Sequence, residues 1–244
     1  MADRTALVTG GSSGIGLAIA RMLGEEGYAL TVSARRPDKL EAAVQGLKDS
    51  GLDAEALAAN VANEEEIISL IEAHRERRGR LDVLVNNAGV GIGASAHEVE
   101  TKHLDMQISV NLRSYVITTR EALPLLKEAG GEHGKALIVN TASIAGKSGQ
   151  PWISVYSATK GGVIALSEAT QKEVASDGIQ VTSLCPGLVD TAMTEWARES
   201  VEPADMIRPE DVSEAVRMLL RTSPNCLIPE IVFTRAGGGE SIPF

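Results

Sequence analysis

Tyr156 and Lys160 are the residues of this chain whose types and spacing most directly suggest chemistry. They stand four residues apart in a stretch whose pattern predicts a helix, so both side chains lie on one helix face. A phenol with an ordinary pKa of about 10 transfers protons poorly at neutral pH. A neighbouring ammonium favours the phenolate and lowers that pKa. The pair therefore predicts a general acid for carbonyl reduction and a general base for alcohol oxidation.

Ser143 extends this constellation, because it follows a predicted strand and so lies at the carboxyl edge of the sheet, where doubly wound proteins bind ligands. Its hydroxyl can hold a substrate oxygen beside Tyr156. By itself, the Tyr156–Lys160 spacing occurs often by chance and is more typical of an ordinary pair on a helix surface. It gains meaning from a glycine-rich turn at the other end of the same chain.

That turn runs from Thr9 to Gly16, directly after the first predicted strand and at the start of a helix. Glycines permit a tight turn and let the backbone approach a pyrophosphate, which the free N–H groups of a helix N-terminus then bind. A glycine-rich turn alone can be purely structural, but this position in a first βα unit favours a dinucleotide site. The residues expected to contact the dinucleotide here are Gly10, Ser12, Ser13, Gly14, Ile15 and Gly16.

The end of the second predicted strand indicates which dinucleotide is bound. NAD sites place Asp or Glu here to hold the ribose 2′-hydroxyl, but this segment has no carboxylate before Asp38. Arginine can instead bind a 2′-phosphate with a charge-assisted fork. We expect Arg35 to make this contact, with Ser33 or Arg36 assisting, and NADP(H) to be preferred over NAD(H). The alternative is that both arginines are ordinary surface charges.

Short apolar runs alternate with helical stretches, as in repeated βαβ units. Strands are expected at Thr5–Thr9, Ala29–Ser33, Ala54–Ala58, Leu81–Val85, Ala136–Asn140, Gln180–Cys185 and Ile228–Phe233. Helices are expected at Ile15–Glu26, Asp38–Lys48, Glu64–Arg77, Thr101–Glu128 (bent by Pro124), Val155–Ser176 and Pro209–Arg221. The predicted fold class is α/β: a doubly wound Rossmann fold with one parallel sheet of about seven strands and helices on both faces. One domain is expected over residues 1–244.

Composition excludes several other classes of function. The net charge of −10 argues against a nucleic-acid partner, and no apolar run reaches the ~20 residues that a membrane crossing needs. Two cysteines are too few for a disulfide framework, which favours a cytoplasmic location. The four histidines have no ligand spacing, so no metal site is expected.

Taken together, these motifs resemble the short-chain dehydrogenase/reductase family from about Arg4 to Gly238. The glycine turn is similar to the family's TGxxxGxG form, and Asn86-Asn87-Ala88-Gly89 resembles its NNAG motif, which steadies the sheet and lines the cofactor. The resemblance implies a catalytic set of Asn111, Ser143, Tyr156 and Lys160. In it, Asn111 bends the long helix and holds a water for proton relay, and Lys160 also grips the nicotinamide ribose.

The resemblance implies further cofactor contacts, among them Asn87, Ala88, Gly89 and the PG stretch with Pro186, Gly187, Val189 and Thr191. In that stretch, the Val189 backbone and the Thr191 hydroxyl hold the nicotinamide carboxamide. Asn60, with Val61 beside it, departs from the family pattern, which commonly has Asp there to accept from the adenine amino group. The amide oxygen of Asn60 can still accept, so adenine binding is expected to be weakened or reoriented.

The implied reaction is hydride transfer between the nicotinamide and a ketone or secondary alcohol. The core sequence is similar to 3-oxoacyl-carrier-protein reductases and equally to ketone, steroid and sugar-alcohol dehydrogenases, so the substrate stays open. Apolar loop residues favour a fairly apolar substrate, and Ala192–Pro209 is expected to form a mobile lid. A small-residue side on the Tyr156 helix favours a homodimer or homotetramer, or simply close packing on the sheet. The alternatives are an NAD(H)-dependent enzyme and a nucleotide-sensing regulator without catalysis.

Overall fold

A seven-stranded parallel sheet forms the centre of residues 4–236, which are the residues that the computed structural model describes. The strand order is β3-β2-β1-β4-β5-β6-β7, with every neighbouring pair parallel. The strands are β1 (Thr5–Thr9), β2 (Ala29–Ala34), β3 (Ala54–Ala58), β4 (Val83–Asn86), β5 (Ala136–Thr141), β6 (Ile179–Pro186) and β7 (Glu230–Phe233). The chain winds outward from β1 in one direction and from β4 in the other, which confirms the predicted doubly wound fold.

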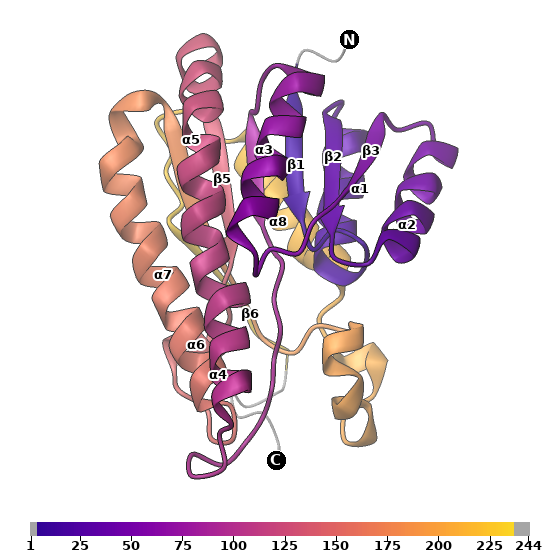
Figure 1. Cartoon of the computed structure of the whole chain (residues 1–244), viewed down its shortest axis with the longest axis vertical. Coiled ribbons are helices and arrows are strands. Elements are labelled where there is room, and N and C mark those ends of the chain that lie inside the picture. Colours follow the sequence, from indigo (N-terminus) through magenta and orange to yellow (C-terminus); the bar gives the residue numbers. More distant parts are fainter. Residues whose placement is uncertain (1–3, 237–244) are drawn as a thin grey trace.

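Helices cover both faces of this sheet, with α1, α2 and α8 on one side and α3, α5 and α7 on the other (Figure 1). The helices are α1 (Gly14–Glu25), α2 (Pro37–Asp49), α3 (Glu64–Arg78), α4 (Thr101–Ile108), α5 (Ser114–His133), α6 (Ile144–Lys147), α7 (Ser154–Val174) and α8 (Pro209–Arg221). Two apolar cores follow from this arrangement, one on each face of the sheet. The central strands are buried along their whole length, as expected for parallel strands covered on both faces.

Helix α3 illustrates how local sequence determines a helix's ends. The Asn63 side chain accepts a hydrogen bond from the Glu65 N–H at the start of the helix. Acidic residues occupy the first turn and arginines the last, so both ends complement the helix dipole. Gly79 then ends the helix with φ 74°, in the left-handed region that favours glycine.

The largest departure from the predicted elements lies in the long helix expected over Thr101–Glu128. It is divided into α4 and α5 by a π-helical turn at Ser109–Arg113, and it runs on to His133. Pro124 is accommodated inside α5, where it does not end the helix. Such π-helical turns insert one extra residue per turn and give no signal in apolar periodicity, which explains why the sequence pattern predicted one continuous helix.

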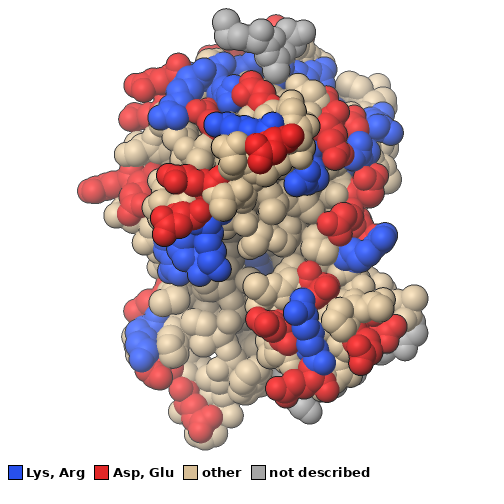
Figure 2. Space-filling view, turned by 90° about the vertical axis from the view of Figure 1, so that its right-hand side faces the viewer, with Lys and Arg blue, Asp and Glu red and all other residues tan. Residues whose placement is uncertain are grey.

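The described helices also bear on membrane insertion. None of the helices within residues 4–236 combines the length and the apolar character that a membrane crossing requires. Figure 2 shows acidic and basic side chains intermixed over the face in view.

His74 is a buried histidine in α3 that makes stability depend on pH. Its ring nitrogens lie 2.8 Å from Thr31 Oγ1 and 2.8 Å from the Arg80 carbonyl oxygen. Burial lowers its pKa from 6.5 to about 4, so it stays neutral in the folded protein while the unfolded chain takes up a proton below pH 6.5. The contribution of neutral His74 to the free energy of unfolding is therefore fully present above pH 6.5 and is lost as the pH falls toward 4.

We expect the free energy of unfolding to fall by about 2 kcal/mol more between pH 7 and pH 5 in the native protein than in His74→Gln. Urea titrations at the two pH values measure this difference, and the variant serves to subtract all other titrating groups. Parallel pH dependence of the two proteins would contradict the assignment of this effect to His74.

Candidate functional site

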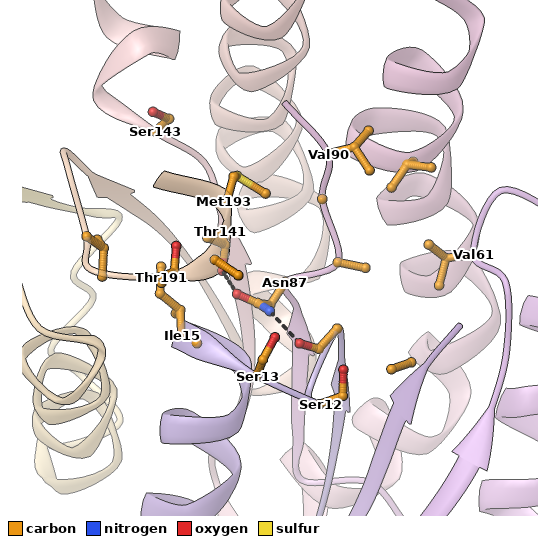
Figure 3. A pocket seen from close by; sticks show the side chains of 18 of the residues that line it. Ser12, Ser13, Ile15, Val61, Asn87, Val90, Thr141, Ser143, Thr191 and Met193 are labelled. Carbon is orange, nitrogen blue, oxygen red and sulfur yellow. Dashed lines mark hydrogen bonds between the residues drawn. The ribbon is translucent and has the colours of Figure 1, made fainter. Parts of the chain in front are cut away.

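The site is a cavity of about 310 Å³ at the carboxyl edge of the sheet, where the chain segments after β1 and β4 diverge (Figure 3). This is the position at which doubly wound proteins bind their ligands. Predicted residues that line it are Gly10, Ser12, Ser13, Gly14, Ile15, Arg35, Arg36, Asn60, Val61, Asn87, Ala88, Gly89, Ser143, Tyr156, Lys160, Pro186, Gly187, Val189 and Thr191. Three predicted residues, Gly16, Ser33 and Asn111, are not among the lining residues.

The glycine turn is shaped by close backbone contacts. Gly10 has φ 66°, and a Cβ there would lie 2.8 Å from Ala88 Cα. A Cβ at Gly16 would lie 2.5 Å from Asn87 Nδ2, so Gly16 serves the packing of the turn from behind the cavity. A Cβ at Gly14 would point across the cavity entrance to within 3.0 Å of the Thr191 methyl group. The glycines thus keep open a cradle that side chains would fill.

The N-terminus of α1 faces this cradle. Ser13 is the N-cap residue, and its side chain makes no capping hydrogen bond. The first N–H groups of the helix therefore remain available to an anion, as at other helix N-termini that bind phosphate. Figure 3 shows Ser12 and Ser13 on the cavity wall below Asn87.

Asn87 ties the glycine turn to the centre of the site. Its amide nitrogen donates to the carbonyl oxygens of Thr9, at 3.2 Å, and Gly10, at 3.3 Å. Its amide oxygen accepts from Thr141 Oγ1 at 3.2 Å (Figure 3). The preceding Asn86 is buried inside the sheet, where its amide donates to Asn140 Oδ1 at 2.9 Å. Asn86 therefore links neighbouring strands of the sheet, and Asn87 links the glycine turn to the end of β5.

Ser143, Tyr156 and Lys160 meet in the central part of the cavity. Ser143 is the N-cap of α6, and its hydroxyl donates to the Pro186 carbonyl at 3.4 Å. Lys160 is 3% exposed, and its Nζ donates to the Thr141 carbonyl at 2.7 Å while lying 5.7 Å from the centroid of the Tyr156 ring. The α-helical spacing predicted from the sequence is present in α7.

Burial sets the protonation of this group. It raises the pKa of Tyr156, and the hydrogen bond with Ser143 opposes this only in part. Burial also lowers the pKa of Lys160 from 10.5 to about 7. The sequence predicts that the neighbouring ammonium lowers the pKa of Tyr156, and burial acts on that pKa in the opposite direction.

Asn111 lies behind the cavity, in the π-helical turn. Its side chain pairs with the backbone of Val90, accepting from N and donating to O at 2.8 Å each, and it donates to Thr159 Oγ1 at 3.2 Å. A Cβ at Gly89 would lie 3.5 Å from Asn111 Oδ1 and 3.6 Å from Lys160 Nζ. Asn111 thus holds the loop after β4 beside the lysine.

The far end of the cavity contains the residues expected at the adenosine. Arg35 and Arg36 are exposed at its rim, and neither forms a salt bridge within residues 4–236. Ser33 is fully buried in β2, so its expected part in this contact has no support from its position. Asn60 Oδ1 accepts from the Ala62 N–H at 3.3 Å, and this bond occupies part of its acceptor capacity.

The opposite end of the cavity is closed by the segment after β6. Thr194 accepts from the Thr191 N–H at 3.1 Å and donates to the Val189 carbonyl. The predicted lid region contains two 3-10 helices, Ala192–Glu199 and Pro203–Asp205, whose own small core is formed by Leu188, Ala197, Val201 and Met206. Figure 1 shows this orange segment projecting beyond the carboxyl edge of the sheet.

Several lining residues were missed from the sequence: Ala34, Ala59, Val90, Val110, Thr141, Ala142, Ala192, Met193 and Thr194. Most are small or apolar and carry no chemical signal of their own. Thr141 acts through its backbone carbonyl, which no sequence motif could indicate. Met193 belongs to Ala192–Pro209, the segment predicted to form a lid, and its place in that segment was the available clue.

Known proteins share this architecture over almost the whole chain. A Streptomyces coelicolor protein, provisionally named a ketoacyl reductase, is 42% identical over 200 residues, covering 81% of this chain and 75% of the relative. The crystal structure of a single-residue variant of actinorhodin polyketide ketoreductase with NADPH has a TM-score of 0.86 at 33% identity, covering 94% of this chain and 95% of that one. The Brucella melitensis 3-ketoacyl-(acyl-carrier-protein) reductase complexed with NADH also has a TM-score of 0.86, at 28% identity, covering 94% and 96%.

The family comparison agrees with the fold and with the motifs that line the cavity. Residues 4–202 match the family described as short chain dehydrogenase. The chain therefore belongs to the short-chain dehydrogenase/reductase family of oxidoreductases, as its motifs predicted.

Proposed function

We propose that this protein is an NADP(H)-dependent oxidoreductase that interconverts a ketone and a secondary alcohol, with Tyr156 as the general acid and base. The observation that carries the proposal is a single cavity that joins a phosphate-binding glycine turn to Tyr156, Lys160 and Ser143. Such a cavity offers an anion cradle at one end and a proton donor at the other. The whole reaction can then take place on one domain.

The donor set fits a phosphorylated dinucleotide. The glycine turn and the free N–H groups of α1 would hold the pyrophosphate, and Arg35 with Arg36 would meet a 2′-phosphate. Lys160 would bind the nicotinamide ribose, and Val189 with Thr191 the carboxamide. When bound, NADPH supplies the hydride that reduces the carbonyl carbon. Neighbouring structures solved with NADPH or NADP support this preference, and the NADH complex named above shows that relatives also use NADH.

The chain's own residues account for the proton. Ser143 and Tyr156 both present hydroxyl groups to the cavity, so together they can hold and polarise a substrate oxygen. The phenol of Tyr156 keeps its proton at neutral pH, so it can act as the donor to the oxygen as the carbonyl is reduced. Lys160 then stabilises the phenolate that remains, and Asn111 keeps the adjoining loop in place.

An apolar ketone is the proposed substrate class. Gly91 lies against the Tyr156 ring and the Met193 sulfur, with contacts of 3.8 and 3.9 Å from its Cβ position. The indole of Trp152 packs over Gly93, two residues after Gly91, and half of its surface is exposed. Trp152 has φ 64°, and its carbonyl accepts from the Ala94 N–H at 2.7 Å, so the loop holds the indole in a strained backbone conformation.

Trp152→Ala is expected to lower kcat/KM for a bulky apolar ketone by about 10-fold and to change that for a small ketone far less. The lost indole removes apolar contact area that only the larger substrate can use. Steady-state kinetics with both substrates measure the effect, and Trp152→Phe keeps an aromatic face as the matched control. Equal losses for both ketones would contradict a role in substrate selection.

The oligomeric state and location are also proposed. Met106, Ile108 and Val116 are large apolar residues that are exposed along α4 and α5, which supports a homodimer or homotetramer. The glycines of α7 give less support, because Gly161 and Gly162 pack against Gly146 and Leu112 of the same chain. Cys185 and Cys226 are both free thiols, in keeping with the cytoplasm.

The deciding experiment follows consumption of NADPH and, separately, NADH with a panel of ketones, diketones and acyl thioesters. Turnover with NADPH that depends on Tyr156 is the expected result. Tight NADPH binding without turnover on any member of the panel would instead favour a nucleotide-sensing role.

A further inference from the structure

The Lys160 ammonium is buried, and no carboxylate among residues 4–236 forms a salt bridge with it. It is 3% exposed, and its one recorded hydrogen bond within the described residues goes to the Thr141 carbonyl of β5. The titratable group that acts on it electrostatically is Cys185 of β6. Burial and the neighbouring Glu230 raise the pKa of that thiol to about 12, so it is neutral at neutral pH. Glu230 itself is paired with Lys147 of α6 at 2.5 Å.

Tyr115 of α5 occupies the place where a counter-charge would be expected. It is 1% exposed, and its ring centroid lies 5.4 Å from Lys160 Nζ. Its hydroxyl donates to the Thr141 carbonyl at 3.2 Å, the same oxygen that accepts from Lys160 at 2.7 Å. Burial holds the pKa of this phenol far above its usual value, so Tyr115 remains a neutral donor. The lysine ammonium is therefore close to two aromatic rings, Tyr115 from α5 and Tyr156 from its own helix.

An aromatic face attracts a cation within about 6 Å, and the attraction is strongest where water is excluded. Tyr115 meets both conditions. The Tyr115 hydroxyl and the Lys160 ammonium share the Thr141 carbonyl as acceptor, so the ring and the ammonium meet at one backbone atom.

We propose that Tyr115 is a positioning residue whose aromatic face keeps the Lys160 ammonium charged beside Tyr156. This inference rests on the proposed function, in which the charge on Lys160 serves the proton transfer by Tyr156. Without the Tyr115 ring, Lys160 loses its proton at a lower pH, and the Tyr156 phenolate loses its stabilising neighbour. Tyr156 would then ionise only at higher pH.

The first test uses the cofactor-free protein and needs no turnover. Lysine-labelled protein is titrated by NMR to follow the Lys160 signal, which is assigned with Lys160→Met. The native midpoint is expected near 7, and Tyr115→Leu is expected to lower it by about one pH unit. Tyr115→Phe, which keeps the ring and removes only the hydroxyl, is expected to stay close to the native midpoint.

Val163→Ala provides a matched control for packing. Val163 belongs to the same small core as Tyr115, Ala142 and Cys185 but has no aromatic face. It should lower the melting temperature without moving the Lys160 midpoint. A native midpoint in Tyr115→Leu would overturn the proposal, as would a shift in Tyr115→Phe or Val163→Ala as large as that in Tyr115→Leu.

The second test links Tyr115 to the reaction through the pH dependence of alcohol oxidation. The rising limb of kcat is expected to move to higher pH in Tyr115→Leu and to return toward native in Tyr115→Phe. If turnover requires Tyr156 but the rising limb does not move in Tyr115→Leu, the inference about Tyr115 is overturned and the proposed function is not. Turnover that does not require Tyr156 would instead refute the proposed function, whatever the NMR midpoints show.

Discussion

Replacing Tyr156 with Phe is expected to lower kcat for ketone reduction by about 10²- to 10⁴-fold, the range that a positioned general acid contributes. The ring remains, so its contact with Gly91 and its place above Lys160 are kept, and only the hydroxyl is lost. NADPH binding should therefore persist. Stopped-flow or steady-state absorbance measures the rate, and quenching of protein fluorescence on NADPH addition measures binding.

Ser143→Ala is the matched comparison for this variant, because it removes the other hydroxyl that faces the substrate oxygen. We expect Ser143→Ala also to lower kcat, but by less than Tyr156→Phe, since Ser143 polarises the oxygen and does not supply the proton. A Tyr156→Phe enzyme that retains native kcat would refute the assignment of the proton donor. Loss of NADPH binding in the same variant would show that the hydroxyl serves the cofactor and not the reaction.

The sequence was most informative where a residue's type and its local position both matter. The glycine turn and the Tyr156–Lys160 spacing were recognisable because a tight turn at a helix N-terminus and an i, i+4 pair are local features. The alternation of apolar runs with helical stretches predicted the strands and helices in the same way. Strands β1 and β3 and helix α8 have the predicted bounds. Their parallel register then brings distant loops to one sheet edge without further information.

Features that depend on contacts across the fold were not predictable. Tyr115 carries no motif, and its place beside Lys160 is a contact between two helices, α5 and α7, that are distant in the sequence. The burial of Tyr156 and Lys160, which shifts both of their pKa values, also depends on the surrounding fold and has no local sequence signal. The positive φ of Trp152 likewise depends on its contact with Gly93 and Ala94.

Arg35→Ala is expected to raise KM for NADPH by about 10- to 100-fold, the equivalent of one or two charge-assisted hydrogen bonds, and to leave KM for NADH nearly unchanged. Arg35 lies at the cavity rim, is exposed and forms no salt bridge within residues 4–236, so its guanidinium is available to a 2′-phosphate. NADH lacks that phosphate, so its binding does not depend on the Arg35 guanidinium. Initial rates with both cofactors, at fixed ionic strength, measure the two KM values.

Arg36→Ala separates a specific contact from general attraction, since it removes the same charge one residue further along the rim. If Arg35 forms a fork with the phosphate, its variant should be affected more than the Arg36 variant, and the gap should persist at high salt. If the two arginines act only as a positive rim, both variants should lose affinity equally and the difference from native should shrink as salt screens it. A native enzyme that prefers NADH would exclude both roles for the arginines. Neutral contacts to the ribose hydroxyls would then have to replace the carboxylate that is missing after β2.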